Sequence, residues 1–153
     1  MLNEPVRYAM AQRKLLIAPP DTTVLEACKS MQARKVSAIV VADAGRLLGI
    51  FTERDAVFRV VAMERDVRTT QLRDVMTADP VTIAPVESLG YALLLMHENG
   101  FRHLPVVEDG VAIGIVSARN ALDPELEEFE SESRRREDLR RGRHSGGGAS
   151  GAD

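Results

Sequence analysis

The stretch Gly49-Ile50-Phe51-Thr52-Glu53-Arg54-Asp55-Ala56 returns later in the chain as Gly114-Ile115-Val116-Ser117-Ala118-Arg119-Asn120-Ala121. In both copies a Gly-Ile pair lies at the end of an apolar run, and a hydroxyl residue then opens a segment with helical spacing of its apolar residues. A serine or threonine with a hydrogen-bonding side chain three residues later is typical of a helix N-terminus. The stretch therefore predicts, twice, a strand that leads directly into a helix.

The similarity extends upstream from this stretch in both copies. At an offset of 65 residues, Met31 matches Met96 and Val41 matches Val106; further upstream, at an offset of 66, Ile17-Ala18-Pro19 matches Ile83-Ala84-Pro85. Matches that keep their order and need a single gap indicate an internal duplication.

Each copy predicts the order strand, helix, strand, strand, helix. A helix follows the first strand, with Thr23 or Ser88 as its cap. The expected strands are residues 15–17, 38–41 and 47–51 in the first copy, and 81–83, 104–107 and 111–116 in the second. A half of about 60 residues buries too little apolar surface to be comfortably stable alone. We therefore expect an α+β fold in which the two halves pack sheet to sheet.

Three segments are expected along the chain: 1–65 as the first repeat with an N-terminal helix, 66–122 as the second repeat, and 123–153 as a charged, Gly-rich tail that is largely disordered. Residues 1–122 hold 14 basic and 14 acidic side chains, whereas the tail holds six arginines and nine acids. A neutral body disfavours broad nucleic-acid binding, which needs a basic face. A nucleic-acid-binding protein that uses the basic tail remains the weaker alternative.

Composition disfavours several other classes of protein. No apolar run approaches the ~20 residues of a membrane helix, and the start lacks the apolar stretch of a signal peptide, so we expect a cytoplasmic protein without membrane contact. The lone Cys28 cannot form an internal disulfide or a cysteine-built zinc cage, and its position predicts a buried structural thiol. No nucleophile elbow or phosphate loop occurs, so we expect no enzyme activity. The histidines His97, His103 and His144 show no paired ligand spacing, so we expect no metal site.

Two groups of residues suit a nucleotide. Thr52, Arg54 and Asp55 combine a helix N-terminus and a cation, which suit phosphate, with a carboxylate that accepts from ribose hydroxyls. Simple helix capping is the alternative for these residues and for Ser117 with Asn120. Arg102-His103 precedes a buried strand, but the corresponding Ser37-Ala38 carries no cation. This difference predicts one phosphate-binding site rather than two equal ones.

Three motifs carry a resemblance to a known family: Gly-Ile-Phe-Thr-x-x-Asp, Val-Met-Thr-x-Asp-Pro-Val and Arg-His-Leu-Pro-Val-Val. Over about residues 6–122 the chain resembles a tandem pair of CBS domains, named after cystathionine β-synthase and also called a Bateman module. The resemblance implies two β-α-β-β-α repeats that pack by their sheets with pseudo-two-fold symmetry. It also implies a stand-alone regulatory protein that binds AMP, ADP, ATP or S-adenosylmethionine between its repeats and signals to an unknown enzyme or transporter.

The resemblance further implies two ligand sites. The main site comprises Ile50, Thr52, Arg54, Asp55, Val81, Ile83, Arg102 and His103. The second site comprises Leu16, Ile17, Ser37, Ala38, Ile115, Ser117 and Asn120. Asp55 would hold the ribose in the main site, and the exchange of Asp for Asn120 predicts weaker binding in the second.

We also expect a homodimer, because CBS pairs commonly form two-fold discs and the helices carry more apolar residues than one module needs to cover. The candidate surplus is Phe58, Val61, Met63, Leu93, Leu94 and Leu95. An assembly module with empty sites is the alternative to a ligand sensor.

Overall fold

The computed structural model describes residues 2–10, 15–119, 132–133 and 135–141. The chain divides into two compact units, Met1–Ala121 and Leu122–Asp153. The doubled pattern lies in the first unit. Asn120, assigned to the second site from sequence, lies outside the described residues.

The first repeat contains the predicted hairpin and both of its helices. Its elements are β1 (Ile17–Ala18), α1 (Val24–Arg34), β2 (Ala38–Asp43), β3 (Arg46–Thr52), α2 (Glu53–Asp55) and the π-helix η2 (Ala56–Val61). Thr23 begins α1 with the predicted capping box: its side chain accepts from the backbone N–H of Glu26, and its own N–H donates to the Glu26 carboxylate.

The second repeat follows the same order. Its elements are α4 (Leu89–Asn99), β5 (His103–Glu108) and β6 (Val111–Ser117), preceded by α3 (Leu72–Val75) and the two-residue strand β4 (Thr77–Ala78). Ser88 caps α4 by accepting from the N–H of Tyr91. After β6, Ala118 and Arg119 are helical, and they are the last described residues of this repeat.

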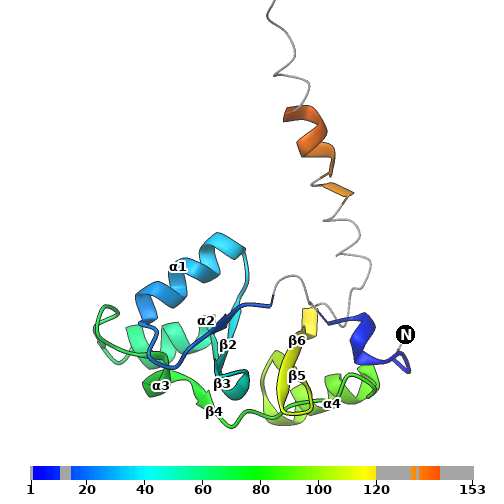
Figure 1. Ribbon diagram of the computed structural model, residues 1–153, viewed down its shortest axis with the longest axis horizontal. Coiled ribbons are helices and arrows are strands. Elements are labelled where there is room, and N and C mark those ends of the chain that lie inside the picture. The colour runs from blue at the N-terminus through cyan, green and yellow to red at the C-terminus, as the bar shows by residue number, and fades with distance from the viewer. Residues whose placement is uncertain (1, 11–14, 120–131, 134, 142–153) are drawn as a thin grey trace, which may run out of the picture. The chain divides into compact units, whose positions relative to one another are not determined.

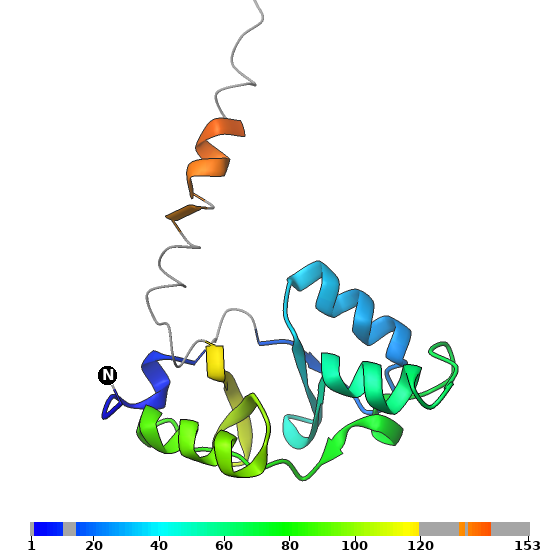
Figure 2. The same cartoon turned by 180° about the vertical axis from the view of Figure 1, so that it is seen from behind.

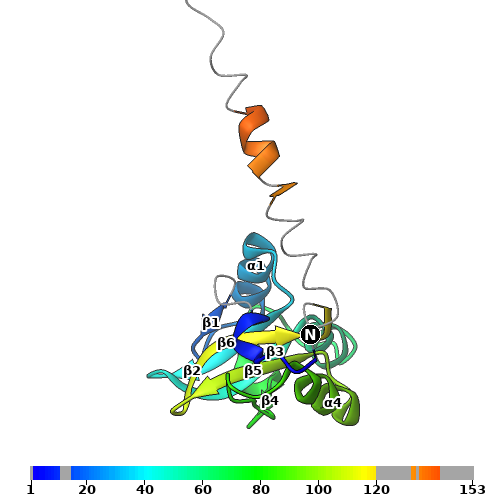
Figure 3. The ribbon, with the colours of Figure 1, turned by 90° about the vertical axis from the view of Figure 1, so that its right-hand side faces the viewer.

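The hairpins β2–β3 and β5–β6 form one sheet in the order β1-β2-β3-β6-β5, with β4 paired to β3 (Figures 1 and 3). The two hairpins join through a single pair, Arg46 with Val111. Beside this junction Val40 and Ala42 of the first repeat pack with Ala112 of the second in a small shared cluster. The two repeats are thus held together by their sheets, as the sequence predicts.

Each repeat has its own core, and each core takes a segment from the other half of the chain. The 3-10 helix η1 (Val6–Tyr8) packs on the second repeat, where Val6 and Met10 join the cluster around Leu89 and Leu104. The N-terminal segment lies against α4 in Figure 2, and the N–H of Val6 donates to the carbonyl of Glu87.

The reverse exchange places α3 in the core of the first repeat. Leu72 and Val75 are fully buried there with α1 and β3 residues. Backbone hydrogen bonds run from the N–H of Leu72 to the carbonyl of Thr22 and from Val24 to Thr70. The sequence boundary at residue 65 follows chain order, whereas the packing crosses it in both directions.

The Gly of each Gly-Ile pair lies where a segment from the other half of the chain crosses the sheet. Gly49 meets the segment that follows α3, and Gly114 meets the segment that follows η1. A Cβ on Gly49 would lie 2.5 Å from Sδ of Met76 and 2.7 Å from the carbonyl oxygen of Thr77. A Cβ on Gly114 would lie 2.7 Å from Sδ of Met10. Glycine is needed here for close approach rather than for an unusual backbone angle.

The expected strand over 81–83 is not formed as a strand. Only Ile83 pairs with β5, through hydrogen bonds to Pro105 and Val107. Pro80 and Pro85 flank this segment, and neither has an N–H to donate to a ladder.

The pairing also corrects the correspondence between the two copies. Ala18 pairs with Val41, and Ile83 pairs with Val106, so Ala18 rather than Ile17 is the counterpart of Ile83. A shift of one residue along a strand turns the side chain to the other face. Accordingly Ile17 is 50% exposed, whereas Ile83 is only 3% exposed.

In the second unit, residues 132–133 and 135–141 are helical and exposed. An i,i+4 ion pair joins Arg136 and Glu132 at 2.8 Å. Within the described residues, no helix has the length and apolar character needed to cross a membrane.

Candidate ligand-binding site

Asp55 is the one buried charged side chain of the described core, with 8% of its surface exposed. Its Oδ2 accepts from the backbone N–H of Thr52 at 2.9 Å and from the Thr52 hydroxyl at 3.3 Å. Its Oδ1 lies 3.4 Å from Nε of Arg59. Helix capping is therefore present at Thr52 and Asp55. A buried carboxylate with acceptor capacity left over suits hydroxyl donors such as those of a ribose.

Arg54 lies beside Asp55 in sequence but is exposed. Its guanidinium lies over the ring of Phe58, 5.6 Å from the centroid. This contact with an aromatic ring holds the cation near the start of the helix and leaves its charge uncompensated by that neighbour. The arrangement is consistent with the cationic role that the sequence predicts for Arg54.

Ser37 and His103 connect the two repeats. The Ser37 hydroxyl and Nε2 of His103 are hydrogen bonded at 2.8 Å. The Ser37 carbonyl accepts from the N–H of Glu53, the first residue of α2. The sequence places His103 in the main site and Ser37 in the second, and the structure brings the two side chains into contact. The two predicted sites thus share this hydrogen bond.

Burial lowers the pKa of His103, and the neighbouring positive charge of Arg102 lowers it further. The imidazole is therefore neutral near pH 7, as its hydrogen bond to Ser37 allows. Arg102 is exposed at the start of β5, and its carbonyl accepts from the N–H of Ala118. Of these two residues, Arg102 supplies the permanent cation.

The apolar residues of the main site have different surroundings. Ile50 is buried on β3, where it pairs with Thr77 of β4. Val81 is 39% exposed and remains available to a ligand. Ile83 is packed in the core of the second repeat, and β5 already uses its backbone N–H and carbonyl. Ile83 is thus buried like Ile50, and the role of either side chain in the main site stays a prediction.

The second site lacks an equivalent of Asp55 within the described residues. Ala38 is buried, Ser37, Leu16 and Ile115 are half-buried, and Ile17 is exposed. Ser117 ends β6 opposite His103. These residues present no cation and no carboxylate.

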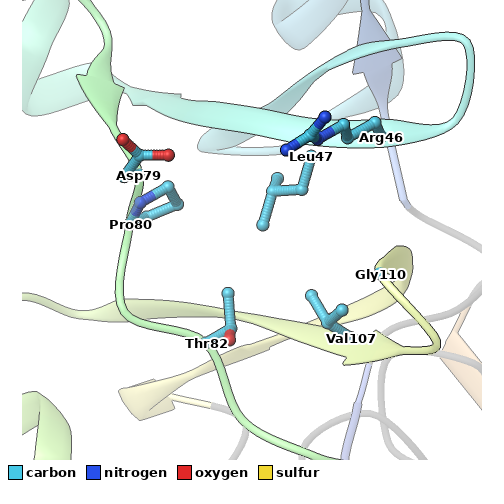
Figure 4. Close-up of a pocket in the computed structure, with 7 residues that line it drawn as sticks. All are labelled: Arg46, Leu47, Asp79, Pro80, Thr82, Val107 and Gly110. Carbon is cyan, nitrogen blue, oxygen red and sulfur yellow. The ribbon is translucent and has the colours of Figure 1, made fainter.

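A separate cavity of about 290 Å³ lies between β3 and the β5–β6 hairpin (Figure 4). Its lining comprises Arg46, Leu47, Asp79, Pro80, Thr82, Val107 and Gly110. In Figure 4 the side chains of Leu47, Thr82 and Val107 lie about an open space, with the charged ends of Arg46 and Asp79 at its rim. None of the predicted site residues lines this cavity.

Arg59 contacts the main site but was not predicted from sequence. Besides Asp55, it reaches the backbone carbonyls of Val75 and Met76. Its position four residues after Asp55 is the spacing of a helical ion pair, a signal that could have found it.

Cys28 packs against the core of the first repeat, and burial raises the pKa of its thiol. A raised pKa keeps the sulfur in its unreactive thiol form. These surroundings agree with the structural role predicted for Cys28.

Comparison with known proteins identifies the family. The CBS domain family model matches residues 6–62 and 72–124, which are the two copies of the repeat. The chain belongs to the CBS domain family. It is a CBS pair, a module of a regulatory kind.

Individual relatives agree with this assignment. CBS domain-containing protein CBSCBSPB1 of Arabidopsis thaliana is 38% identical over 110 residues, which cover 71% of this chain but only 20% of that protein. A putative signal-transduction protein with CBS domains from Burkholderia ambifaria has a TM-score of 0.70 and 32% identity, covering 74% of this chain and 83% of that one. The hexameric CBS-CP12 protein from bloom-forming cyanobacteria has a TM-score of 0.73 and 25% identity, covering 80% and 68%.

Proposed function

We propose that this CBS pair is a regulatory module that binds an adenosine-containing ligand at the main site. The ligand class is AMP, ADP, ATP or S-adenosylmethionine. The observation that carries the proposal is the buried carboxylate of Asp55, which lies at the start of a helix beside Arg54. No catalytic step is assigned to the protein.

Each part of the ligand has a suitable group at this site. Asp55 accepts from ribose hydroxyls, and Ile50 and Val81 offer apolar contact to the base. Arg54 and Arg102 are exposed cations for phosphate. His103 adds a positive charge only when protonated, so phosphate binding should strengthen as the pH falls toward its lowered pKa.

The second site is proposed to bind the same class of ligand more weakly. Its counterpart of Asp55 is Asn120, and a neutral amide forms weaker hydrogen bonds with hydroxyls than a carboxylate does. The counterparts of Arg102 and His103 are Ser37 and Ala38, which are uncharged.

A first experiment identifies the ligand. The native protein is purified without added nucleotide, and the small molecules released on denaturation are analysed by mass spectrometry. We expect an adenosine-containing compound. A melting curve with added AMP follows, because a ligand at 100 times its dissociation constant adds about 2.7 kcal/mol of stability. No shift with AMP, ADP, ATP or S-adenosylmethionine would contradict the proposal.

Self-association is the second part of the proposed function. Val57, Phe58, Val61 and Met63 leave between 51% and 68% of their surfaces exposed near the end of the first repeat. Leu94 of α4 is 49% exposed, whereas Leu93 and Leu95 are half-buried against the second core. An exposed apolar face of this kind fits a second copy of the chain. The hexameric state of the cyanobacterial CBS-CP12 protein supports assembly of such modules.

A further inference from the structure

Arg59 makes three polar contacts that reach two different segments of the chain. Its Nε lies 3.4 Å from Oδ1 of Asp55. Its Nη1 donates to the carbonyl oxygen of Met76 at 2.9 Å and of Val75 at 3.3 Å. About half of the Arg59 side chain is exposed, whereas the Asp55 side chain is 11% exposed. The guanidinium therefore covers a buried carboxylate from the solvent side.

The two segments joined by Arg59 are α2, which ends at Asp55, and the end of α3. Asp55 belongs to the first repeat. Met76 leads directly into β4, which pairs with Gly49 and Ile50 of β3. A planar guanidinium with several fixed donors can hold a carboxylate and a carbonyl pair together, whereas the ammonium of lysine is a single point charge.

The acceptor capacity of Asp55 shows what Arg59 does to the carboxylate. Both contacts from Thr52 fall on Oδ2, and Arg59 contacts Oδ1. An ionised carboxylate has about four acceptor positions, so capacity remains on Oδ1. Thr52 alone would leave Oδ1 without a fixed neighbour. Arg59 therefore gives Oδ1 a fixed neighbour beside its remaining acceptor capacity.

The helix around Arg59 adds a second observation. Residues 56–61 form a π-helix, with hydrogen bonds from the N–H of Ala62 to Val57 and of Arg65 to Val60. π-Helical turns are rare and occur frequently at functional sites. Here the turn carries the side chain that reaches both Asp55 and Met76.

We propose that Arg59 is the positioning residue of the main site: it orients the Asp55 carboxylate toward the ribose hydroxyls and couples ligand binding to the segment Met76–Ala78. This inference rests on the proposed function. It adds a route by which a bound adenosine ligand changes the connection between the two repeats.

The test uses isothermal titration with AMP, 2′-deoxy-AMP and 3′-deoxy-AMP. The variants are Arg59→Gln, Arg59→Lys and the control Arg65→Gln, which removes one charge from an exposed neighbouring arginine. Wild type should prefer AMP over one deoxy analogue by about tenfold or more, the size of a lost hydrogen bond to a charged group. Arg59→Gln and Arg59→Lys should reduce this preference to about threefold or less, and Arg65→Gln should retain it.

A second measurement reports on the coupling. Hydrogen exchange at the amides of residues 77 and 78 should slow when AMP binds to wild type, and AMP should change it less in Arg59→Gln. If Arg59→Gln weakens all three nucleotides equally and keeps the ribose preference, Arg59 is merely structural and the inference is overturned. If wild type binds no AMP, the proposed function itself fails, which is a different outcome.

Discussion

The two repeats share one fold but differ at the positions where a ligand would bind. Both have the same hairpin, a capped helix and a Gly-Ile pair before the final helix. The first repeat follows this pair with a buried Asp55 held by Thr52 and Arg59. The second has Asn120 at the matching position and supplies its cation, Arg102, from the start of β5. The duplication thus preserves the secondary structure of the repeat, whereas the polar residues at the ends of its strands differ between the two copies.

This difference indicates a division of labour between the repeats. Under the proposed function, the first repeat would supply the hydroxyl acceptor Asp55 and the cation Arg54, and the second would supply Arg102 and His103. The hydrogen bond between Ser37 and His103 links the two contributions. Two equivalent sites would instead require matching groups in both repeats.

The first prediction compares the exposed helix faces of the two repeats. Phe58→Glu places a charge on the apolar face of η2 and should raise the dissociation constant for self-association about tenfold or more. Leu94→Glu should raise this dissociation constant by a smaller factor, because Leu93 and Leu95 beside it are half-buried against the second core.

Light scattering at micromolar concentration measures the mass, and Leu139→Glu in the tail is the matched exposed control. Wild type should exceed the 16.8 kDa of one chain. A wild-type mass of one chain under these conditions would rule out this face as a self-association surface.

The second prediction compares the two glycines where exchanged segments cross. Gly49→Ala should cost about 1–3 kcal/mol of unfolding free energy, because the new methyl group meets the Thr77 carbonyl as well as Met76. Gly114→Ala should cost less than about 1 kcal/mol, since it meets only the flexible side chain of Met10. Urea unfolding of both variants checks this order, and equal costs would show that the two crossings are equivalent.

The third and smallest effect concerns pH, because His103 has no titrating counterpart at Ala38. The pKa of His103 is lowered by burial and by Arg102, so folding disfavours its protonation. Its contribution to stability is present above its ordinary pKa of about 6.5 and is lost as the pH falls through the lowered value. His103→Gln should flatten the stability profile in this acidic window, and His97→Gln, at an exposed position, should not. Identical profiles for wild type and His103→Gln would contradict the assignment.

Local patterns in the sequence predicted most of the secondary structure. Thr23 and Ser88 begin helices because their hydroxyls cap nearby N–H groups, a choice that depends on neighbouring residues alone. The two hairpins follow from apolar runs separated by turn residues. The order of the repeats and the CBS family also followed from the duplicated motifs.

The contacts between segments far apart in the chain could not be predicted from the sequence. The move of Val6 and Leu72 into each other's repeat depends on which core accepts them, and chain order does not reveal it. Ala18 pairs with Val41, so the side chain of Ile17 lies on the opposite face of the sheet from that of Ile83. The Ile-Ala-Pro sequence is identical in both copies and does not indicate this shift of one residue. The reach of Arg59 to Met76 depends on the same exchange. Of the predicted main site, the Thr52–Asp55 contact followed from local spacing, whereas the burial of Ile83 did not.

The most direct test of the account is isothermal titration of AMP into wild type, Asp55→Ala and Asn120→Ala. Removing a charged acceptor from a buried hydrogen bond costs about tenfold to a hundredfold in affinity, so Asp55→Ala should lose most of the binding. Asn120→Ala should stay within about twofold of wild type, because it affects only the weaker second site. Tight AMP binding that survives Asp55→Ala but is lost in Asn120→Ala would show that the ligand occupies the other site.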